Sequence, residues 1–255
     1  MLEKKSEKIS YFDAHFHFSD CIENNCFDST DDILGISCFH SKEEWDKSFQ
    51  VENNWKGFRA FGLHPLNPEI NLFPFLESLS DEKKINAIGE CGFDFFKDEY
   101  KSDFVRQNDA FRLQLELAQK KNLPLIIHSR KANEKIFEYS SELKKLPSVL
   151  FHSFMGSFTE AKALKNRGIN AYFSFGKQIV NGNKKVIECV KNIPHECLLL
   201  ETDVPYQYLK GEEKTYSSEI KKIYEGAFNI REDIQDYSEF SDILRKNFTA
   251  CFGNL

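Results

Sequence analysis

The feature that most constrains the fold of this chain is an alternation of eight short apolar segments with segments of helical periodicity. The clearest helical segment repeats apolar residues at helical spacing and ends at Asn122-Leu123-Pro124. Strands that alternate with helices over short connections are parallel and are joined by helical crossovers. The predicted strands are 9–13, 33–39, 57–62, 85–89, 125–127, 149–151, 169–175 and 197–200, and the clearest predicted helices are 103–122, 132–145, 159–167 and 184–192.

Eight such units predict an α/β fold, the closed (β/α)8 or TIM barrel. A barrel of this kind typically takes about 250 residues, and the chain has 255. An open doubly wound sheet is the alternative, but the chain has no Gly-x-Gly-x-x-Gly turn. Because no linker, low-complexity tract or further repeat interrupts the pattern, we expect residues 1–255 to form a single domain.

Most of the unusual polar residues lie at the carboxyl ends of the predicted strands. In an extended strand residues i and i+2 point to the same side, so His15 and His17 can present both imidazoles to one ion. A barrel brings the carboxyl ends of all its strands to one mouth, where residues far apart in sequence converge. Five of the seven histidines and two carboxylates follow strands in this way: His15, His17, His64, Glu90, His128, His152 and Asp203.

This set of side chains predicts a metal site. Imidazole and carboxylate ligands suit divalent ions such as zinc, manganese or magnesium. A hydrogen-bonded polar core is the alternative, but buried ionised carboxylates are unfavourable unless cations or other partners compensate them. A divalent ion also lowers the pKa of a bound water from 15.7 to roughly 7, which supplies a nucleophile at neutral pH. We expect two ions, with His15, His17, Glu90, His128, His152 and Asp203 as the ligands.

Asp203 is the strongest candidate for the catalytic base, because a carboxylate at the mouth can both bind an ion and accept the proton of the attacking water. Capping of a helix is its alternative role. Glu201 ranks second, since strand alternation turns it to the same side as Asp203 only if the strand continues regularly to that point.

Two further residues are candidates for binding substrate. His64, before Pro65, could hydrogen-bond a phosphate or a scissile oxygen, or it could pack within a loop. Arg130 could pair bidentately with phosphate, or it could be a solvated surface charge. His40 lacks a surrounding motif and His195 precedes the last strand, so we expect both to be structural or exposed.

Composition narrows the possible partners and compartment. A formal net charge of −6 argues against a broad basic surface for duplex nucleic acid, although bound cations could still support a nucleic-acid substrate. The seven cysteines include no Cys-x-x-Cys pair, so reduced thiols are expected. No apolar run approaches a membrane span, and the charged start lacks a signal region. We therefore expect a cytoplasmic protein with no membrane partner.

The candidate residues lie in an ordered set of motifs: Asp13-Ala14-His15-Phe16-His17, Gly62-Leu63-His64-Pro65, Ile88-Gly89-Glu90-Cys91-Gly92-Phe93-Asp94, His128-Ser129-Arg130, His152-Ser153-Phe154-Met155-Gly156-Ser157 and Glu201-Thr202-Asp203-Val204-Pro205-Tyr206. With these motifs the chain resembles the TatD family of metal-dependent deoxyribonucleases, within the amidohydrolase-like barrels. The resemblance extends over about residues 10–250 and implies hydrolysis of phosphodiester bonds in DNA, often from a strand end. It also implies that His15, His17 and Asp203 bind one ion, that His128 and His152 bind the other, and that Glu90 bridges them with a catalytic role.

One segment departs from the family pattern. The family usually has an Arg-Gly-rich stretch after the last strand, whereas residues 209–218 contain no arginine and carry Glu212 and Glu213. This difference bears on recognition of phosphate or of a strand end, and it leaves the metal chemistry untouched.

The expected substrate is single-stranded DNA or a strand end, and the expected state is a monomer. One alternative is a related metallohydrolase that cleaves an ester, amide or aminoacyl-tRNA bond. A second is a non-catalytic barrel that keeps its metals, against which the complete ligand set speaks, because loss of Glu90 or Asp203 is the expected mark of an inactive site.

Overall fold

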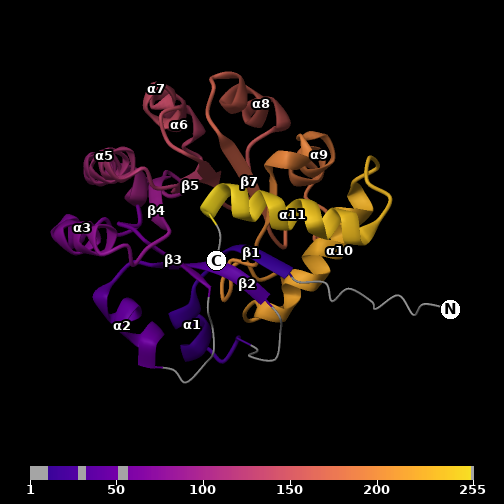
Figure 1. The fold of residues 1–255 in the computed structure, drawn as a ribbon, viewed down its shortest axis with the longest axis horizontal. Helices are drawn as coiled ribbons and strands as arrows, with labels where there is room; N and C mark the ends of the chain where they lie inside the picture. The colour runs from indigo at the N-terminus through magenta and orange to yellow at the C-terminus, as the bar shows by residue number, and fades with distance from the viewer. Residues whose placement is uncertain (1–10, 28–32, 51–56, 254–255) are drawn as a thin grey trace.

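A computed structural model describes residues 11–27, 33–50 and 57–253. Its centre is one parallel sheet of eight strands in the order β1 to β8, in which each strand pairs with the next. Helices lie around this ring of strands (Figure 1). The predicted (β/α)8 barrel is therefore confirmed. The prediction that residues 1–255 form one domain extends beyond the described ranges and stays a prediction.

The strand bounds differ from the predicted ones chiefly at the carboxyl ends. The predictions for β2 and β6 agree with the structure, but β1, β4 and β5 continue further than predicted. His15, Glu90 and His128 consequently lie within strands, where the barrel wall fixes their backbone. The strands are β1 Tyr11–Phe16, β2 Ile33–Phe39, β3 Phe58–Phe61, β4 Ala87–Asp94, β5 Leu125–Arg130, β6 Val149–Phe151, β7 Ala171–Phe175 and β8 Leu198–Leu200.

The helices include the four that the sequence predicts. The bounds of α9 agree with the prediction, and those of α5 and α8 differ by one residue at each end. Segment 132–145 forms two helices that meet at Tyr139, whose hydroxyl donates to Asn108 Oδ1 on α5 at 2.7 Å. The helices are α1 Phe18–Glu23, α2 Lys42–Gln50, α3 Phe73–Asp81, α4 Asp98–Ser102, α5 Phe104–Lys121, α6 Asn133–Glu138, α7 Ser140–Leu143, α8 Phe158–Asn166, α9 Lys184–Asn192, α10 Ile220–Ile230 and α11 Tyr237–Phe252.

Helix α11 closes the amino-terminal end of the barrel. It lies across the ring of strands in Figure 1, and the Phe248 ring packs against Phe12 and Phe58 at 5.3 and 5.4 Å between centroids. The side-chain amide of Asn247 donates to the carbonyls of His195 and Leu198. This end is filled with apolar side chains, so the opposite end is left for the polar mouth. Among the described residues, no helix combines the length and apolar character needed to span a membrane.

The barrel closes between β1 and the segment after β8. The Asp203 N–H donates to the His15 carbonyl at 3.0 Å, and the Asp13 carboxylate accepts from the Thr202 N–H and hydroxyl at 3.0 and 2.6 Å. At the other end of β1, the Tyr224 hydroxyl of α10 accepts from the Phe12 N–H at 2.9 Å. Side chains therefore complete the hydrogen bonding that a β1–β8 ladder would otherwise provide.

Replacing Tyr224 by phenylalanine is expected to lower the free energy of unfolding by about 1–3 kcal/mol, because the buried Phe12 N–H loses its partner. Chemical denaturation of both proteins measures the difference. Tyr208 is 57% exposed, so Tyr208→Phe serves as the control that removes a hydroxyl from the surface. Equal stability of Tyr224→Phe and wild type would contradict this role for the buried hydroxyl.

Candidate metal centre

The first pair of ligand-type side chains comes from the end of β1. His15 is the fifth residue of the strand and His17 follows it in an extended conformation, so strand alternation turns both rings to the mouth. Their Nε2 atoms lie 3.2 Å apart. Two imidazole nitrogens that face each other at this distance can share one proton or bind one cation between them.

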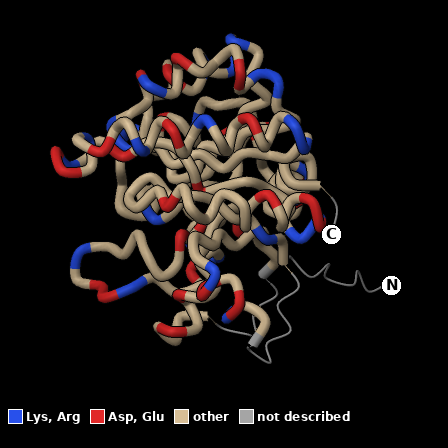
Figure 2. The backbone as a smooth tube through the Cα atoms, turned by 90° about the vertical axis from the view of Figure 1, so that its left-hand side faces the viewer, with Lys and Arg blue, Asp and Glu red and all other residues tan. Residues whose placement is uncertain are grey.

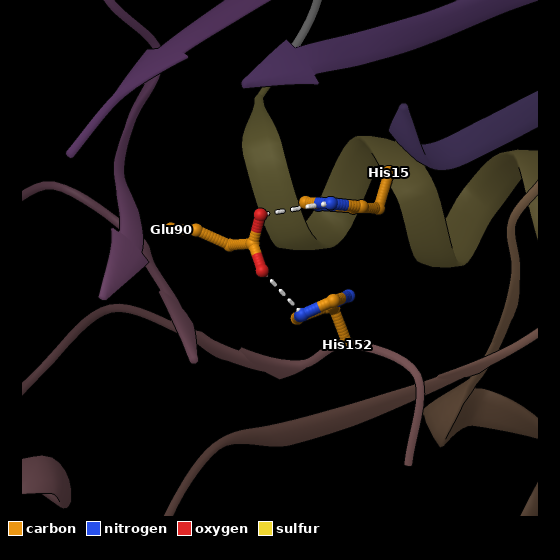
Figure 3. A group of neighbouring side chains, drawn as sticks. All are labelled: His15, Glu90 and His152. Atoms are coloured by element: carbon orange, nitrogen blue, oxygen red, sulfur yellow. Dashed lines mark ion pairs between the residues drawn. The ribbon is translucent and has the colours of Figure 1, made fainter. Parts of the chain in front are cut away.

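Glu90 lies at the centre of the mouth, with 2% of its surface exposed. One carboxylate oxygen faces His15 and the other faces His152, as Figure 3 shows. Each oxygen in fact has its own set of three imidazoles, so the carboxylate stands between two groups of nitrogen donors. Oε2 lies 3.2, 3.6 and 3.4 Å from nitrogens of His15, His17 and His40, and Oε1 lies 2.6, 3.0 and 3.4 Å from nitrogens of His152, His128 and His64.

Asp203 joins the first of these groups. Its Oδ1 lies 3.4 Å from His15 Nε2 and 3.3 Å from His17 Nε2. Its Oδ2 accepts a hydrogen bond from the side-chain amide of Gln207 at 2.8 Å, which leaves Oδ1 directed at the histidines. The residue has a positive φ of 54°, and its carbonyl accepts from the Tyr206 N–H at 2.7 Å in the turn that follows.

Three buried groups orient the histidines from behind. Asp94 at the end of β4 lies 3.0 Å from His128 Nε2, Glu201 Oε1 lies 3.8 Å from His152 Nδ1, and Cys38 Sγ lies 3.4 Å from His15 Nδ1. Such contacts fix the ring orientation and direct the remaining nitrogen of each histidine toward the centre. Glu201 therefore faces the back of His152, and its hydrogen bond from the Ser174 hydroxyl holds it there.

The carboxylates at the centre stay ionised. Burial opposes the charge of Glu90, but His152 and His15 offset it and hold the pKa of this carboxyl well below its usual range. The pKa of Asp203 is also lowered, because hydrogen bonds and charge interactions with His15 and His17 outweigh its burial. Burial lowers the pKa of the His64 imidazole to about 3, so this ring is neutral at pH 7.

The donor set fits divalent cations. Among the residues that the structure describes, oxygen and nitrogen donors that could hold an ion fall into four groups, each with its ligand atoms within 4.8 Å of one another: His15 with Glu90 and His152, His15 with His17 and Asp203, His17 with His40 and Glu90, and His64 with Glu90 and His128. His40 Nε2, which lies 3.4 Å from Glu90 Oε2, is buried without a hydrogen-bond partner. Cations between these donors would satisfy nitrogens and carboxylates together, which hydrogen bonds within the cluster do not achieve.

The chain is similar in sequence to proteins of a known family. The sequence model of the family described as TatD related DNase matches residues 12–253. This chain belongs to that family. The Bacillus subtilis protein YabD, named an uncharacterized metal-dependent hydrolase, is 32% identical to it over 204 residues, which are 76% of this chain and 77% of YabD. The expected family and the expected class, a metal-dependent hydrolase, are thereby confirmed.

Two further matches concern a named nuclease and a solved structure. The 3'-5' ssDNA/RNA exonuclease TatD of Shigella flexneri is 34% identical over 180 residues, which are 68% of this chain and 66% of that protein. The crystal structure of YJJV, a TatD homolog from Escherichia coli, superposes with a TM-score of 0.83 at 23% identity and covers 96% of this chain and 98% of its own. This structural similarity to YJJV shows that the two proteins share a fold.

His40 differs from its expectation in this TatD-family chain. We expected a structural or exposed side chain, but its Nε2 lies 3.4 Å from Glu90 Oε2 at the mouth. The sequence carries a signal for this position, because His40 directly follows the correctly predicted strand β2. His195 agrees with its expectation: it precedes β8 at the closed end of the barrel, and half of its side chain is exposed.

The two candidate substrate residues lie on the same side of the mouth. His64 Nδ1 accepts from the Leu66 N–H at 3.1 Å, and its Nε2 faces Glu90. The ring therefore contacts both the loop after β3 and the cluster of ligand-type residues. The half-exposed guanidinium of Arg130 lies 3.7 Å from Asp94 Oδ2 and borders the open cavity. Arg130 is therefore accessible to a ligand in this cavity.

An open cavity of about 760 Å³ lies above the cluster. Its floor contains the ligand-type residues, and its rim exposes large apolar side chains, which are Leu66, Met155, Tyr206 and Tyr208. The Tyr206 hydroxyl donates to Asp20 Oδ2 at 2.9 Å, which fixes one of these rings beside His17. A cavity with a polar floor and an apolar rim suits a ligand that has both polar groups and flat rings.

In segment 209–218, which follows β8, one of the two acidic residues pairs with a lysine of the same protein. Glu212 accepts from the Leu209 N–H at 2.8 Å and from the Lys177 ammonium at 2.5 Å. Lys177 is buried and also pairs with Glu219. The Glu212 carboxylate therefore holds this loop to the segment after β7. Because Lys177 pairs with this charge, Glu212 does not by itself make the cavity repel phosphate.

Proposed function

We propose that this protein is a nuclease that uses two divalent ions to hydrolyse phosphodiester bonds of single-stranded DNA or of a strand end. The observation that carries the proposal is the placement of Glu90 between two groups of histidines, one at each carboxylate oxygen. One ion at each oxygen makes use of both groups. Two ions flanking a phosphodiester can stabilise the attacking and the leaving oxygen of the same displacement.

The proposed ligand assignment follows from these groups. His15, His17 and Asp203 would bind the first ion, since their donor atoms lie within 4.8 Å of one another. His128 and His152 would bind the second ion from the other side of Glu90, which would bridge the two. Zinc, manganese and magnesium are the candidate ions, and the nitrogen-rich donor set favours zinc or manganese over magnesium.

Divalent ions at these positions would supply Lewis-acid activation of water and phosphate. Side chains of the protein would accept the proton and bind the phosphate. Asp203 accepts the proton of the attacking water through its ionised carboxylate, while the Gln207 amide keeps that carboxylate oriented. Neutral His64 and cationic Arg130, on the same side of the cavity, are proposed to hydrogen-bond the phosphate oxygens.

Single strands suit the surface better than a duplex. In Figure 2 the Lys and Arg positions are interspersed with Asp and Glu positions along the backbone, and the chain has a net charge of −6, which does not favour the broad basic contact that a duplex needs. The exposed rings at the cavity rim can stack on unpaired bases. The Shigella flexneri relative is named for action on single-stranded DNA and RNA, which supports the same substrate class here.

Compartment and state are proposed on narrower grounds. The seven cysteines are free and buried, as expected for a protein of a reducing compartment, so we propose a cytoplasmic location. We also propose that the protein is a monomer without a membrane partner. Size-exclusion chromatography with light scattering tests the monomer.

The test of the proposed function uses a 12-nucleotide single-stranded DNA labelled at either end, the matching duplex and a single-stranded RNA. With added divalent ion we expect the single strands to be shortened, with EDTA abolishing the reaction. A panel of carboxylic esters, amides and lactones is the comparison. Turnover of that panel without release of nucleotides would overturn the proposal in favour of a different metallohydrolase.

The purified protein is expected to contain about two divalent ions per chain. Six ligand-type side chains exceed the four that one tetrahedral zinc takes, and the two oxygens of Glu90 face separate donor groups. Elemental analysis after gel filtration measures the ratio. A ratio of one at saturating metal would contradict the bridging assignment, and full activity of a metal-free preparation would remove the metal mechanism.

A further inference from the structure

A second cavity, of about 700 Å³, opens beside the first. Its lining comes from the residue after β4, from α4 and α5, from the segment that leads into α6, from α6 itself and from α8. The chain passes directly from one cavity to the other, since Ser129 and Arg130 line the first and Lys131 and Ala132 line the second. A flexible ligand that leaves the metal centre past Arg130 therefore meets this second surface next.

The junction carries an exposed aromatic ring that two cationic side chains contact. The side chain of Phe96 is 46% exposed. The Arg130 guanidinium lies 4.2 Å from its ring centroid and the Lys131 ammonium lies 4.7 Å from it. The Phe96 N–H donates to Asp94 Oδ1 at 2.9 Å, so the backbone under the ring is tied to the end of β4. The ring is held in place by its backbone and remains open to solvent.

A second ring and further cations continue the surface. Phe104 at the start of α5 is 36% exposed, and the Lys135 ammonium lies 5.0 Å from its centroid. Phe95 packs against Phe104 at 6.1 Å between centroids and supports it from below. Lys101 of α4 lines the same cavity. Aromatic rings interleaved with lysine and arginine are typical of surfaces that bind single-stranded nucleic acid.

Three carboxylates balance the three lysines of this lining in formal charge, but two of the carboxylates are engaged in contacts of their own. Glu138 pairs with Lys135 at 2.5 Å. Glu160 accepts from the Ser157 N–H and the Asn133 amide as part of the capping of α8. Glu134 is the third carboxylate of the lining. The strongest cationic character is therefore at the Phe96 end of the surface, beside the metal centre.

We propose that this surface, defined by Phe96, Phe104, Lys101, Arg130 and Lys131, binds the part of a nucleic-acid single strand that lies outside the metal centre. One unpaired base stacks on Phe96, and the neighbouring phosphates lie against Arg130 and Lys131. The proposal rests on the proposed nuclease function and deepens it. It predicts a preference for strands longer than a dinucleotide, because a dinucleotide fills the first cavity alone. A duplex is excluded from the stacking, since its bases already stack on one another.

The test compares kcat/KM for a 12-nucleotide oligothymidylate and for a thymidine dinucleotide, using the metal-loaded full chain. Phe96→Ala is expected to lower the ratio of the two values about tenfold, as loss of one base-stacking ring does in other single-strand surfaces. Phe96→Trp keeps a ring and is expected to restore the ratio. Phe49→Ala is the matched control, because Phe49 is also exposed and also lies against an arginine, Arg59, but at the closed end of the barrel.

Lys131 is tested separately by salt dependence. Its backbone has a positive φ of 52°, so Lys131→Asn removes the charge while keeping a residue that tolerates this conformation. The slope of log KM for the 12-mer against log salt is expected to fall by about 0.7, the value for one phosphate contact on a single strand. Phe96→Ala is expected to leave that slope unchanged.

Equal ratios for Phe96→Ala, Phe49→Ala and wild type would overturn the proposal while leaving the nuclease function in place. If the wild type degrades no oligonucleotide, the nuclease function itself fails. Fluorescence anisotropy with a labelled 12-mer then decides on the surface: weaker binding by Phe96→Ala than by Phe49→Ala supports it, and equal binding overturns it.

Discussion

Glu90→Gln is expected to abolish stoichiometric metal binding and to lower turnover of single-stranded DNA by at least about 10²- to 10³-fold. The substitution keeps the size of the side chain but removes the charge that two groups of histidines share. An amide offers one acceptor oxygen in place of two, so it cannot bridge two ions as a carboxylate does. Elemental analysis and an oligonucleotide assay on the same preparation measure both effects.

Two other variants show whether the effect is specific to the position of Glu90. Glu116→Gln, on the exposed surface of α5, removes the same charge far from the mouth and should leave metal content and turnover near wild type. His64→Ala should lower turnover less than Glu90→Gln and should keep both ions, because His64 is proposed to contact substrate. Near-normal metal content of a folded Glu90→Gln protein would show that the bridging assignment is wrong.

The fold was predictable because its signals are local. The β2 strand and helix α9 have clear apolar patterns of the right period, and their predicted bounds agree with the structure. The end of β4 differs from the prediction, which ends this strand at Gly89. The strand instead continues to Asp94, because β5 pairs alongside it through Arg130. That extension is a tertiary effect, and it is what places both Glu90 and Asp94 within reach of His128.

The metal-ligand candidates were predictable from their position after strands, but the groups that support them were not. From the sequence alone, Glu201 ranks second as the base, because it lies two residues from Asp203. The structure instead turns it against Ser174 and His152, contacts that depend on packing between distant strands. Gln207 gave no sequence signal, since the turn after β8 had to be known before its amide could be placed on Asp203. Side-chain contacts across the barrel are the information that the sequence pattern lacks.

The helix-cap alternative for Asp203 can now be compared with the structure. Among the described residues, β8 is followed by turns, and the next helical element begins at Ser217. The Asp203 carboxylate faces His15 and His17 on one side and accepts from Gln207 on the other. These contacts favour a role at the metal centre, where charge and basicity matter, over a role in capping, where asparagine serves about as well as aspartate.

Asp203→Asn is therefore expected to lower turnover of single-stranded DNA by about 10²- to 10⁴-fold, the usual contribution of a general base. The amide keeps one acceptor oxygen and the size of the side chain, so the melting temperature should change little. Turnover is measured at saturating metal, which separates the loss of the base from weaker ion binding.

Asp20→Asn is the matched control for this substitution. Asp20 is a carboxylate of the same cavity that accepts from the Tyr206 hydroxyl at 2.9 Å. Its replacement removes an equal charge from the mouth, so it reports how much of any loss is due to the general electrostatic field. If Asp203→Asn and Asp20→Asn had equal turnover, the charge of the cavity and not the basicity of Asp203 would be the cause. A much larger loss for Asp203→Asn, in a protein of unchanged stability, is the result that assigns proton transfer to this carboxylate.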